Sequence, residues 1–145
     1  MKEILRVENL KKHFTKKGFF SSKSNTVKAV DGVSFYLNEG EVFVIAGESG
    51  SGKSTIAKLI LKSIQLDSGK IFFEEEEIGN EQSKIKKIRM NCQMIHQDPY
   101  DSINPRMRIG DIVSEPLEIH KIGNKNDRKK RTIEVLHEVK LEPVE

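Results

Sequence analysis

The sequence predicts an α/β fold in which a glycine-rich loop joins a buried strand to an amphipathic helix. The run VFVIA, at Val42–Ala46, shows no alternation of apolar and polar residues and lies between two glycine-containing turns, which is typical of a central parallel strand covered on both faces. The loop GESGSGKS follows at once. From Lys53 onward, apolar residues recur at helical spacing, at Ile56, Leu59, Ile60 and Ile64. We expect this helix to end before the turn formed by residues 67–69.

Several further strands are expected on either side of this unit. Residues Ile4–Val7 are rich in strand formers, and apolar and polar residues alternate over Val33–Leu37. The lysine-rich and serine-rich stretch Lys16–Thr26 between them predicts an exposed hairpin loop or short insertion. After the turn, KIFFE has the composition of a strand, and another strand is expected around Cys92–His96.

The last third of the sequence is predicted to be helical. Apolar residues follow a helical period over Ile109–Ile119 and again over Asp127–Leu141, where Asp127 is a plausible N-cap. The polar stretch Gly79–Lys87 favours a loop, and the acidic run Glu74–Glu77 is expected to be solvated. We find no internal repeat.

Length and composition set limits on what the chain does. Its 145 residues, 36% hydrophobic and 32% charged, suit one modest globular domain, and a net charge of +3 favours no class of partner. The longest apolar run, Val42–Ala46, is far shorter than the roughly 20 residues of a membrane-spanning helix. The start MKEILRVENL has charges inside what would have to be the apolar core of a secretion signal, and Cys92 has no second cysteine to pair with. We therefore predict a cytosolic protein in which Cys92 is an apolar filler of a strand.

The loop at residues 47–54 fits the pattern of a phosphate-binding loop, and the physical reason is clear for each position. Glycines let the backbone wrap closely, so that successive N–H groups point at phosphate oxygens beside the positive end of the following helix. Lys53 would reach the β- and γ-phosphates, Ser54 would supply a hydroxyl to Mg²⁺, and Thr55 would lie near the α-phosphate. The loop itself consists of Gly47, Glu48, Ser49, Gly50, Ser51 and Gly52.

This motif is specific enough to predict nucleotide binding. Average composition would produce it by chance in roughly one chain in 200, and here it also stands between a buried strand and an amphipathic helix, as its mechanism requires. The four histidines show no metal-ligand spacing and have no cysteine partners, so we expect no zinc site.

Longer segments around the loop resemble the nucleotide-binding subunits of ATP-binding-cassette (ABC) transporters. The resemblance runs through LRVENLKKHF, VKAVDGVSFYLNEGEVFVIAGESGSGKST, LDSGKIFF and MIHQDPYDSINPRM with SEPLEIH, and it covers almost the whole chain. The segment QDPYDSINPRM is similar to subunits that energise the import of oligopeptides and dipeptides, with relatives that carry nickel. The resemblance implies a P-loop NTPase of ABC type: an antiparallel β-subdomain and phosphate-loop core over about residues 1–98, then the start of a helical subdomain over about 99–145.

The resemblance also implies roles for two further residues in binding ATP and Mg²⁺. Phe14 matches the aromatic residue that stacks on adenine, although Phe19 or Phe20 could take that role and Phe14 could simply pack in the small sheet. Gln97 matches the glutamine that contacts Mg²⁺ and the attacking water, so it joins Lys53 as a residue expected to support hydrolysis.

Partners follow from the same resemblance. They are a second ATPase subunit, transmembrane permease subunits and, indirectly, an extracytoplasmic binding protein, with this chain on the inner face of the membrane. Residues that either contact the permease or pack internally are Tyr100, Ile103, Pro105 and Met107. No nucleic-acid partner is expected.

Three motifs that catalysis in this family needs are absent from the sequence: a Leu-Ser-Gly-Gly-Gln-like signature, an apolar strand ending in Asp-Glu, and a switch histidine. The stretch IFFEEEE imitates the second of these but matches an early hairpin of the family. We therefore expect the N-terminal part of a longer subunit, which binds nucleotide better than it hydrolyses it. Two alternatives stay open: a complete small kinase or GTPase with Asp98 as its Mg²⁺-ordering acid, and a cassette ATPase that acts on nucleic acid.

Overall fold

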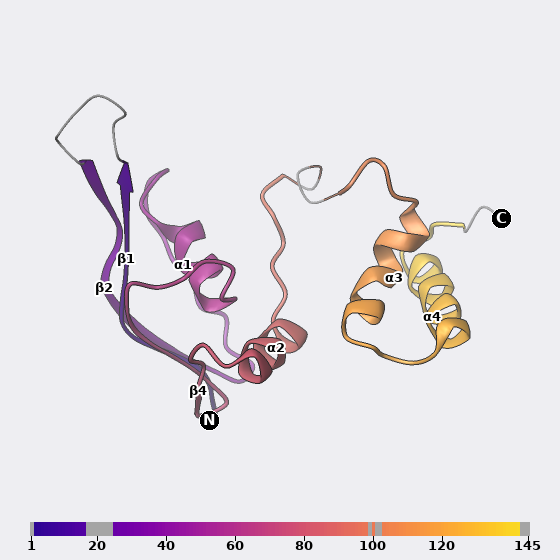
Figure 1. The fold of residues 1–145 in the computed structure, drawn as a ribbon, viewed down its shortest axis with the longest axis horizontal. Coiled ribbons are helices and arrows are strands. Elements are labelled where there is room, and N and C mark those ends of the chain that lie inside the picture. Colours follow the sequence, from indigo (N-terminus) through magenta and orange to yellow (C-terminus); the bar gives the residue numbers. More distant parts are fainter. Residues whose placement is uncertain (1, 17–24, 99, 101–102, 143–145) are drawn as a thin grey trace. The chain divides into compact units, whose positions relative to one another are not determined.

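The computed structural model describes residues 2–16, 25–98, 100 and 103–142, and the chain forms two compact units, Met1–Met94 and Ile95–Glu145. The first unit is built on a four-stranded antiparallel sheet in the order β2-β1-β3-β4 (Figure 1). Its strands are β1 (Glu3–Lys16), β2 (Asn25–Asn38), β3 (Ser68–Phe73) and β4 (Glu76–Glu77). The predicted strands in the first forty residues and after the turn at 67–69 are thus confirmed, and β1 and β2 extend well beyond the predicted cores.

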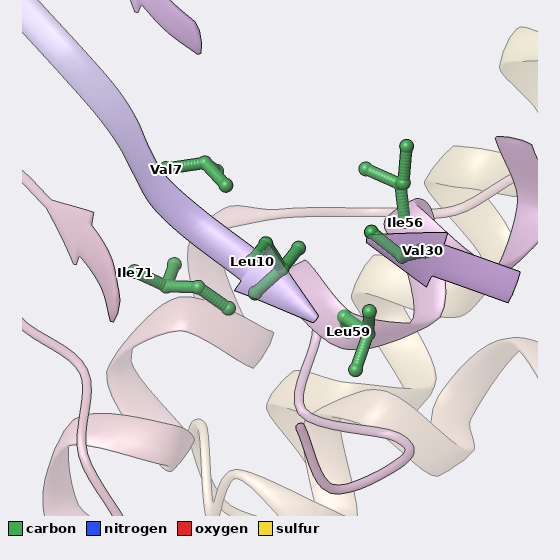
Figure 2. Close-up of a cluster of buried hydrophobic side chains, with 6 residues drawn as sticks. All are labelled: Val7, Leu10, Val30, Ile56, Leu59 and Ile71. Atoms are coloured by element: carbon green, nitrogen blue, oxygen red, sulfur yellow. The ribbon is translucent and has the colours of Figure 1, made fainter. Parts of the chain in front are cut away.

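Helix α1 (Lys53–Ile60) packs on this sheet through its apolar face. Ile56 and Leu59, three residues apart, point to the same side of the helix, where they are 6% and 0% exposed. There they meet side chains from three strands in one buried cluster (Figure 2). The cluster consists of Val7, Leu10, Val30, Ile56, Leu59 and Ile71. The cluster fixes the helix, and with it the loop that precedes it, to the sheet.

Helix α2 (Gln82–Asn91) lies where the sequence suggested a loop over Gly79–Lys87, so that prediction was wrong. Few apolar residues mark its period, but Ile88 is fully buried beside Phe73 and Ile78 in a second apolar cluster. Basic residues on α2 pair with the acidic run: Lys87 Nζ lies 3.0 Å from a Glu74 carboxylate oxygen. Tertiary packing and these ion pairs therefore stabilise a helix whose own sequence signal is weak.

Two apolar segments predicted as strands are not strands. Val42–Ala46 has no regular secondary structure, and Val42 and Val44 are 89% and 75% exposed. Cys92–His96 is likewise irregular, with Ile95 95% exposed. A strand needs backbone hydrogen-bond partners beside it, and within the described residues none of the four strands pairs with either segment. Their apolar composition predicts that they are buried, but the described part of the fold leaves most of their side chains exposed.

Cys92 therefore does not fill a strand; it follows α2 as its C-cap and packs half-buried against the second apolar cluster. Burial raises the pKa of the Cys92 thiol, and the negative charge of Glu74 adds to the shift. Because the thiolate is the reactive form, both effects oppose reactivity.

The second unit contains two helices that pack on each other, α3 (Ile109–Ile119) and α4 (Lys125–Glu138). The predicted bounds of α3 are confirmed. The N-cap of α4 is Asn124, not Asp127 as predicted: the Asn124 side chain accepts hydrogen bonds from the backbone of Asn126 and Asp127, and the Asp127 carboxylate accepts one from the Asn124 backbone. Asp127 thus holds the third helical position of a capping box. Among the described helices, none combines the length and the apolar character needed to cross a bilayer.

Replacement of Leu59 by alanine should lower the free energy of unfolding by about 2–5 kcal/mol, because it opens a cavity between α1 and the sheet. Urea denaturation followed by circular dichroism measures the change. Val27→Ala is the control, since this β2 side chain is 54% exposed and its loss should cost less than about 1 kcal/mol. Equal losses in the two variants would contradict the packing of α1 on the sheet.

Candidate functional site: the phosphate-binding loop

The phosphate-binding loop, residues 47–54, leads directly into α1. The N-cap of α1, Gly52, has φ +94° and offers no side-chain hydrogen bond to the first turn of the helix. The first N–H groups of an α-helix have no partner within the helix, and here no side chain caps them. With the positive end of the helix dipole beside them, these N–H groups form a ready site for an anion.

Gly52 is also required by the fold. A Cβ at this position would lie 2.0 Å from the backbone oxygen of Ala29 in β2, so the end of the loop passes directly against the sheet. Gly50 also has a positive φ, +82°, but nothing lies within 4 Å of the place its Cβ would occupy. The two glycines thus serve different ends: Gly50 allows the turn, and Gly52 allows both the turn and the close approach.

The Lys53 ammonium holds the loop in a closed form. Its Nζ donates hydrogen bonds to the backbone oxygens of Gly47, at 2.7 Å, and Glu48, at 2.6 Å, and lies 3.3 Å from the Ser51 hydroxyl. The Ser51 N–H donates to the same Glu48 oxygen, at 3.2 Å. The loop therefore curls around one positive charge, which is the charge that phosphate oxygens would meet.

The other predicted loop residues are open to solvent or lie close to the helix start. Ser49 and Ser54 are exposed, and Thr55 is half-buried in the first turn of α1. The hydroxyl of Ser54, directly after Lys53, belongs to the same helix end as the uncapped N–H groups. An alcohol oxygen that keeps contact with water suits Mg²⁺, which retains several of its waters.

Phe14 lies near the end of β1, with 42% of its surface exposed, so it is not part of either buried cluster. The Lys12 ammonium lies 5.5 Å from the centre of its ring. Phe19 and Phe20, the competing candidates for stacking on a base, lie outside the described residues. An exposed aromatic face is what base stacking requires, and the role of Phe14 stays a prediction.

Asp67 fixes the segment of β1 just before Phe14. The sequence had predicted only that Asp67 belongs to a turn. Its carboxylate accepts hydrogen bonds from Lys12 Nζ at 2.8 Å and from the His13 N–H at 2.6 Å. The Lys12 hydrogen bond, followed by that of His13, holds the pKa of Asp67 below its usual value. These partners lie more than fifty positions apart in sequence, so only the sheet pairing brings them together.

Gln97 belongs to the second unit, whereas the loop belongs to the first, and the Gln97 side chain is exposed. The segment that follows is also open: Tyr100 and Ile103 are 85% and 47% exposed, and Pro105 is exposed. Met107 is half-buried. Pro99, Asp101 and Ser102 lie outside the described residues. The open surface leaves these side chains accessible to a partner.

The sequence also suggested Asp98 as an alternative Mg²⁺-ordering acid. The Asp98 carboxylate accepts a hydrogen bond from the Tyr100 N–H at 2.9 Å, so it closes a local turn. Within the described ranges, no three His, Cys, Asp or Glu side chains gather closely enough to hold a metal ion.

Comparison with known proteins places this geometry in context. The family model described as "ABC transporter" matches residues 30–145. The oligopeptide transport ATP-binding protein OppF of Streptococcus mutans is 44% identical over 142 residues, which are 97% of this chain and 44% of that protein. The oligopeptide transport ATP-binding protein AppF of Bacillus subtilis is 40% identical over 143 residues, again 97% of this chain and 44% of that protein. The chain thus spans less than half the length of these relatives.

Solved structures agree with the family match. An ATP-binding cassette, MJ0796, determined as a dimer in a post-hydrolysis state with ADP and Pi, superposes with a TM-score of 0.74 at 25% identity, covering 96% of this chain and 58% of that one. CbiO1 of Clostridium perfringens, part of an ABC transporter complex, gives a TM-score of 0.68 at 25% identity, covering 98% of this chain and 52% of that one. The predicted fold class is confirmed.

Gly52→Ala should destabilise the protein more than Gly50→Ala, although both glycines have positive φ. Each alanine bears the cost of a left-handed backbone, but only the one at position 52 also overlaps the Ala29 oxygen, which adds about 1–3 kcal/mol. Thermal unfolding of the two variants side by side measures the difference. An equal or smaller loss for Gly52→Ala would show that the loop does not pass against β2.

Proposed function

Because the chain belongs to the ABC transporter family, we propose that it is the nucleotide-binding part of an ATPase subunit that powers the import of oligopeptides or dipeptides, or of nickel. The observation that carries the proposal is the phosphate-binding loop closed around Lys53 at an uncapped helix start. The relatives at 44% and 40% identity, both named oligopeptide transport ATP-binding proteins, support peptides as the cargo class.

In the proposed mechanism, the residues of this chain bind and orient the triphosphate of ATP. The N–H groups of residues 48–53 would donate hydrogen bonds to phosphate oxygens. Lys53 Nζ would leave the carbonyl oxygens of Gly47 and Glu48 and bind the β- and γ-phosphates instead. Bound Mg²⁺ would neutralise charge on these phosphates, with Ser54 as a ligand. Thr55 would lie near the α-phosphate, and Phe14 would stack on the adenine. The exposed ring of Phe14 supports this placement.

We further propose that Gln97 links hydrolysis to transport. Its amide both donates and accepts hydrogen bonds, so it would contact Mg²⁺ and the attacking water without adding charge. It also begins the exposed segment that carries Tyr100, Ile103, Pro105 and Met107, which would dock on transmembrane permease subunits. The start of the helical subdomain would follow, from about residue 99.

Hydrolysis would require a longer subunit and a second copy of the ATPase. The missing signature and the missing strand that ends in Asp-Glu would come from further sequence and from the partner ATPase subunit. The dimeric state of the cassette MJ0796 supports such an assembly. An extracytoplasmic binding protein would select the cargo, and this subunit would sit on the inner face of the membrane.

Lys53→Ala should weaken the binding of Mg-ATP by about 10- to 100-fold, because the phosphates lose a charge-assisted hydrogen bond. Isothermal titration calorimetry measures the dissociation constant. Lys58→Ala is the matched control, since Lys58 is an exposed lysine in the same helix, and its affinity should stay within about twofold of the parent. Parent-like affinity in Lys53→Ala would remove the loop as the nucleotide site.

In the assembled transporter, Gln97→Ala should lower ATPase activity and transport about tenfold or more, while the affinity for ATP changes little, because the glutamine would act on the attacking water. Gln93→Ala controls for loss of an exposed glutamine amide in the preceding segment. ATP turnover in reconstituted vesicles, together with nucleotide titration, separates the two effects. Unchanged turnover and transport would exclude Gln97 from the mechanism.

A further inference from the structure

A cavity of about 620 Å³ lies in the first unit, and no residue of the phosphate-binding loop lines it. Its walls come from the turn after α1, from β3, from the end of β4 and from α2 with the loop before it. Volumes of roughly 300–1,000 Å³ are typical of sites for small molecules. The lining also has an apolar part, the apolar floor, which is formed by the half-buried side chains Ile64, Leu66 and Ile85.

Charged side chains line the walls of this cavity and leave an excess of positive charge. Three of them, Lys62, Lys70 and Arg89, are cationic, and Glu77 is the only acidic one, so the formal net charge of the lining is +2. Glu77 is paired with Lys70, whose Nζ lies 3.3 Å from its carboxylate. The excess charge therefore rests on Lys62 and Arg89.

Arg89 is held in place by backbone carbonyls just after α1. Its Nε and Nη2 atoms donate to the backbone oxygens of Leu61, at 3.2 Å, and Lys62, at 2.7 Å. These bonds satisfy carbonyls at the end of α1, and they fix the guanidinium next to Lys62 with further N–H groups to spare.

Lys62 occupies an unfavourable position for a lysine. Its φ is +52°, in the left-handed region that favours glycine or asparagine, and it is half-buried. Burial lowers the pKa of its ammonium, and the charge of Glu77 opposes that shift only in part. Within the described part of the chain, no carboxylate lies within ion-pair distance of Lys62. An anion in the cavity would supply the missing partner.

We propose that this cavity binds a small organic phosphate. A phosphate monoester carries a charge of about −1.5 to −2 at neutral pH, which matches the excess positive charge of the lining. Lys62 and the spare N–H groups of Arg89 hold the phosphate, and the apolar part of the ligand lies on Ile64, Leu66 and Ile85. The site is separate from the phosphate-binding loop and does not depend on the function proposed for it.

Phenyl phosphate is a suitable probe, because it joins a dianion to an apolar ring. Titration into the ¹⁵N-labelled protein carrying Lys53→Ala, which weakens the phosphate-binding loop, should give saturable amide shifts at Gly69 and Gly79 in the cavity wall. Phenol, which lacks the charge, should not bind measurably, and inorganic phosphate, which lacks the ring, should bind several-fold more weakly. Equal affinity for inorganic phosphate would overturn the role of the apolar floor.

Charge variants test the assignment in both directions. Lys62→Gln should weaken the binding of phenyl phosphate about tenfold, whereas Glu77→Gln should strengthen it several-fold, because it removes the one negative charge of the lining. Lys58→Gln, in α1 and outside the cavity, should leave the affinity unchanged. Absence of saturable shifts, or equal affinities in the Lys62 and Lys58 variants, would overturn the proposal.

Discussion

The close approach of Gly52 to the backbone of Ala29 is the constraint on which the rest of the first unit depends. It sets where the phosphate-binding loop ends and α1 begins, because only a residue without a Cβ fits against β2 at that point. One turn later, Ile56 and Leu59 enter the buried cluster and fix the helix direction. The sheet thus positions the helix end, and the helix end positions the N–H groups that would face an anion.

Lys53 connects this architecture to chemistry. In the structure its ammonium is held by two loop carbonyls, so the loop keeps its curled form around a positive charge. Phosphate oxygens carry more charge than carbonyls and compete well for the same ammonium. In the proposed function, nucleotide binding would be an exchange of partners in a shaped loop, which would avoid much of the entropy cost of ordering that loop.

Local sequence patterns predicted the glycine-rich loop, α1, α3 and the strands over Ile4–Val7 and Val33–Leu37, because each is specified by residues close together in the chain. Asp67 and Arg89 escaped prediction because their partners lie more than twenty-five positions away. The prediction that failed most clearly, a buried strand at Val42–Ala46, rested on an unbroken apolar run between two glycines. Apolar composition reports a need for burial, and whether neighbours meet that need depends on pairing that no local window contains.

We propose that Lys53 leaves the loop carbonyls and binds phosphate when nucleotide arrives. A crystal structure of the protein with Mg-ATP tests it most directly. We expect the β-phosphate within hydrogen-bond distance of the backbone N–H groups of residues 50–53, and Lys53 Nζ moved from the Gly47 and Glu48 oxygens to the phosphates. A nucleotide bound outside the loop, or a Lys53 that keeps both carbonyls with nucleotide present, would contradict the account.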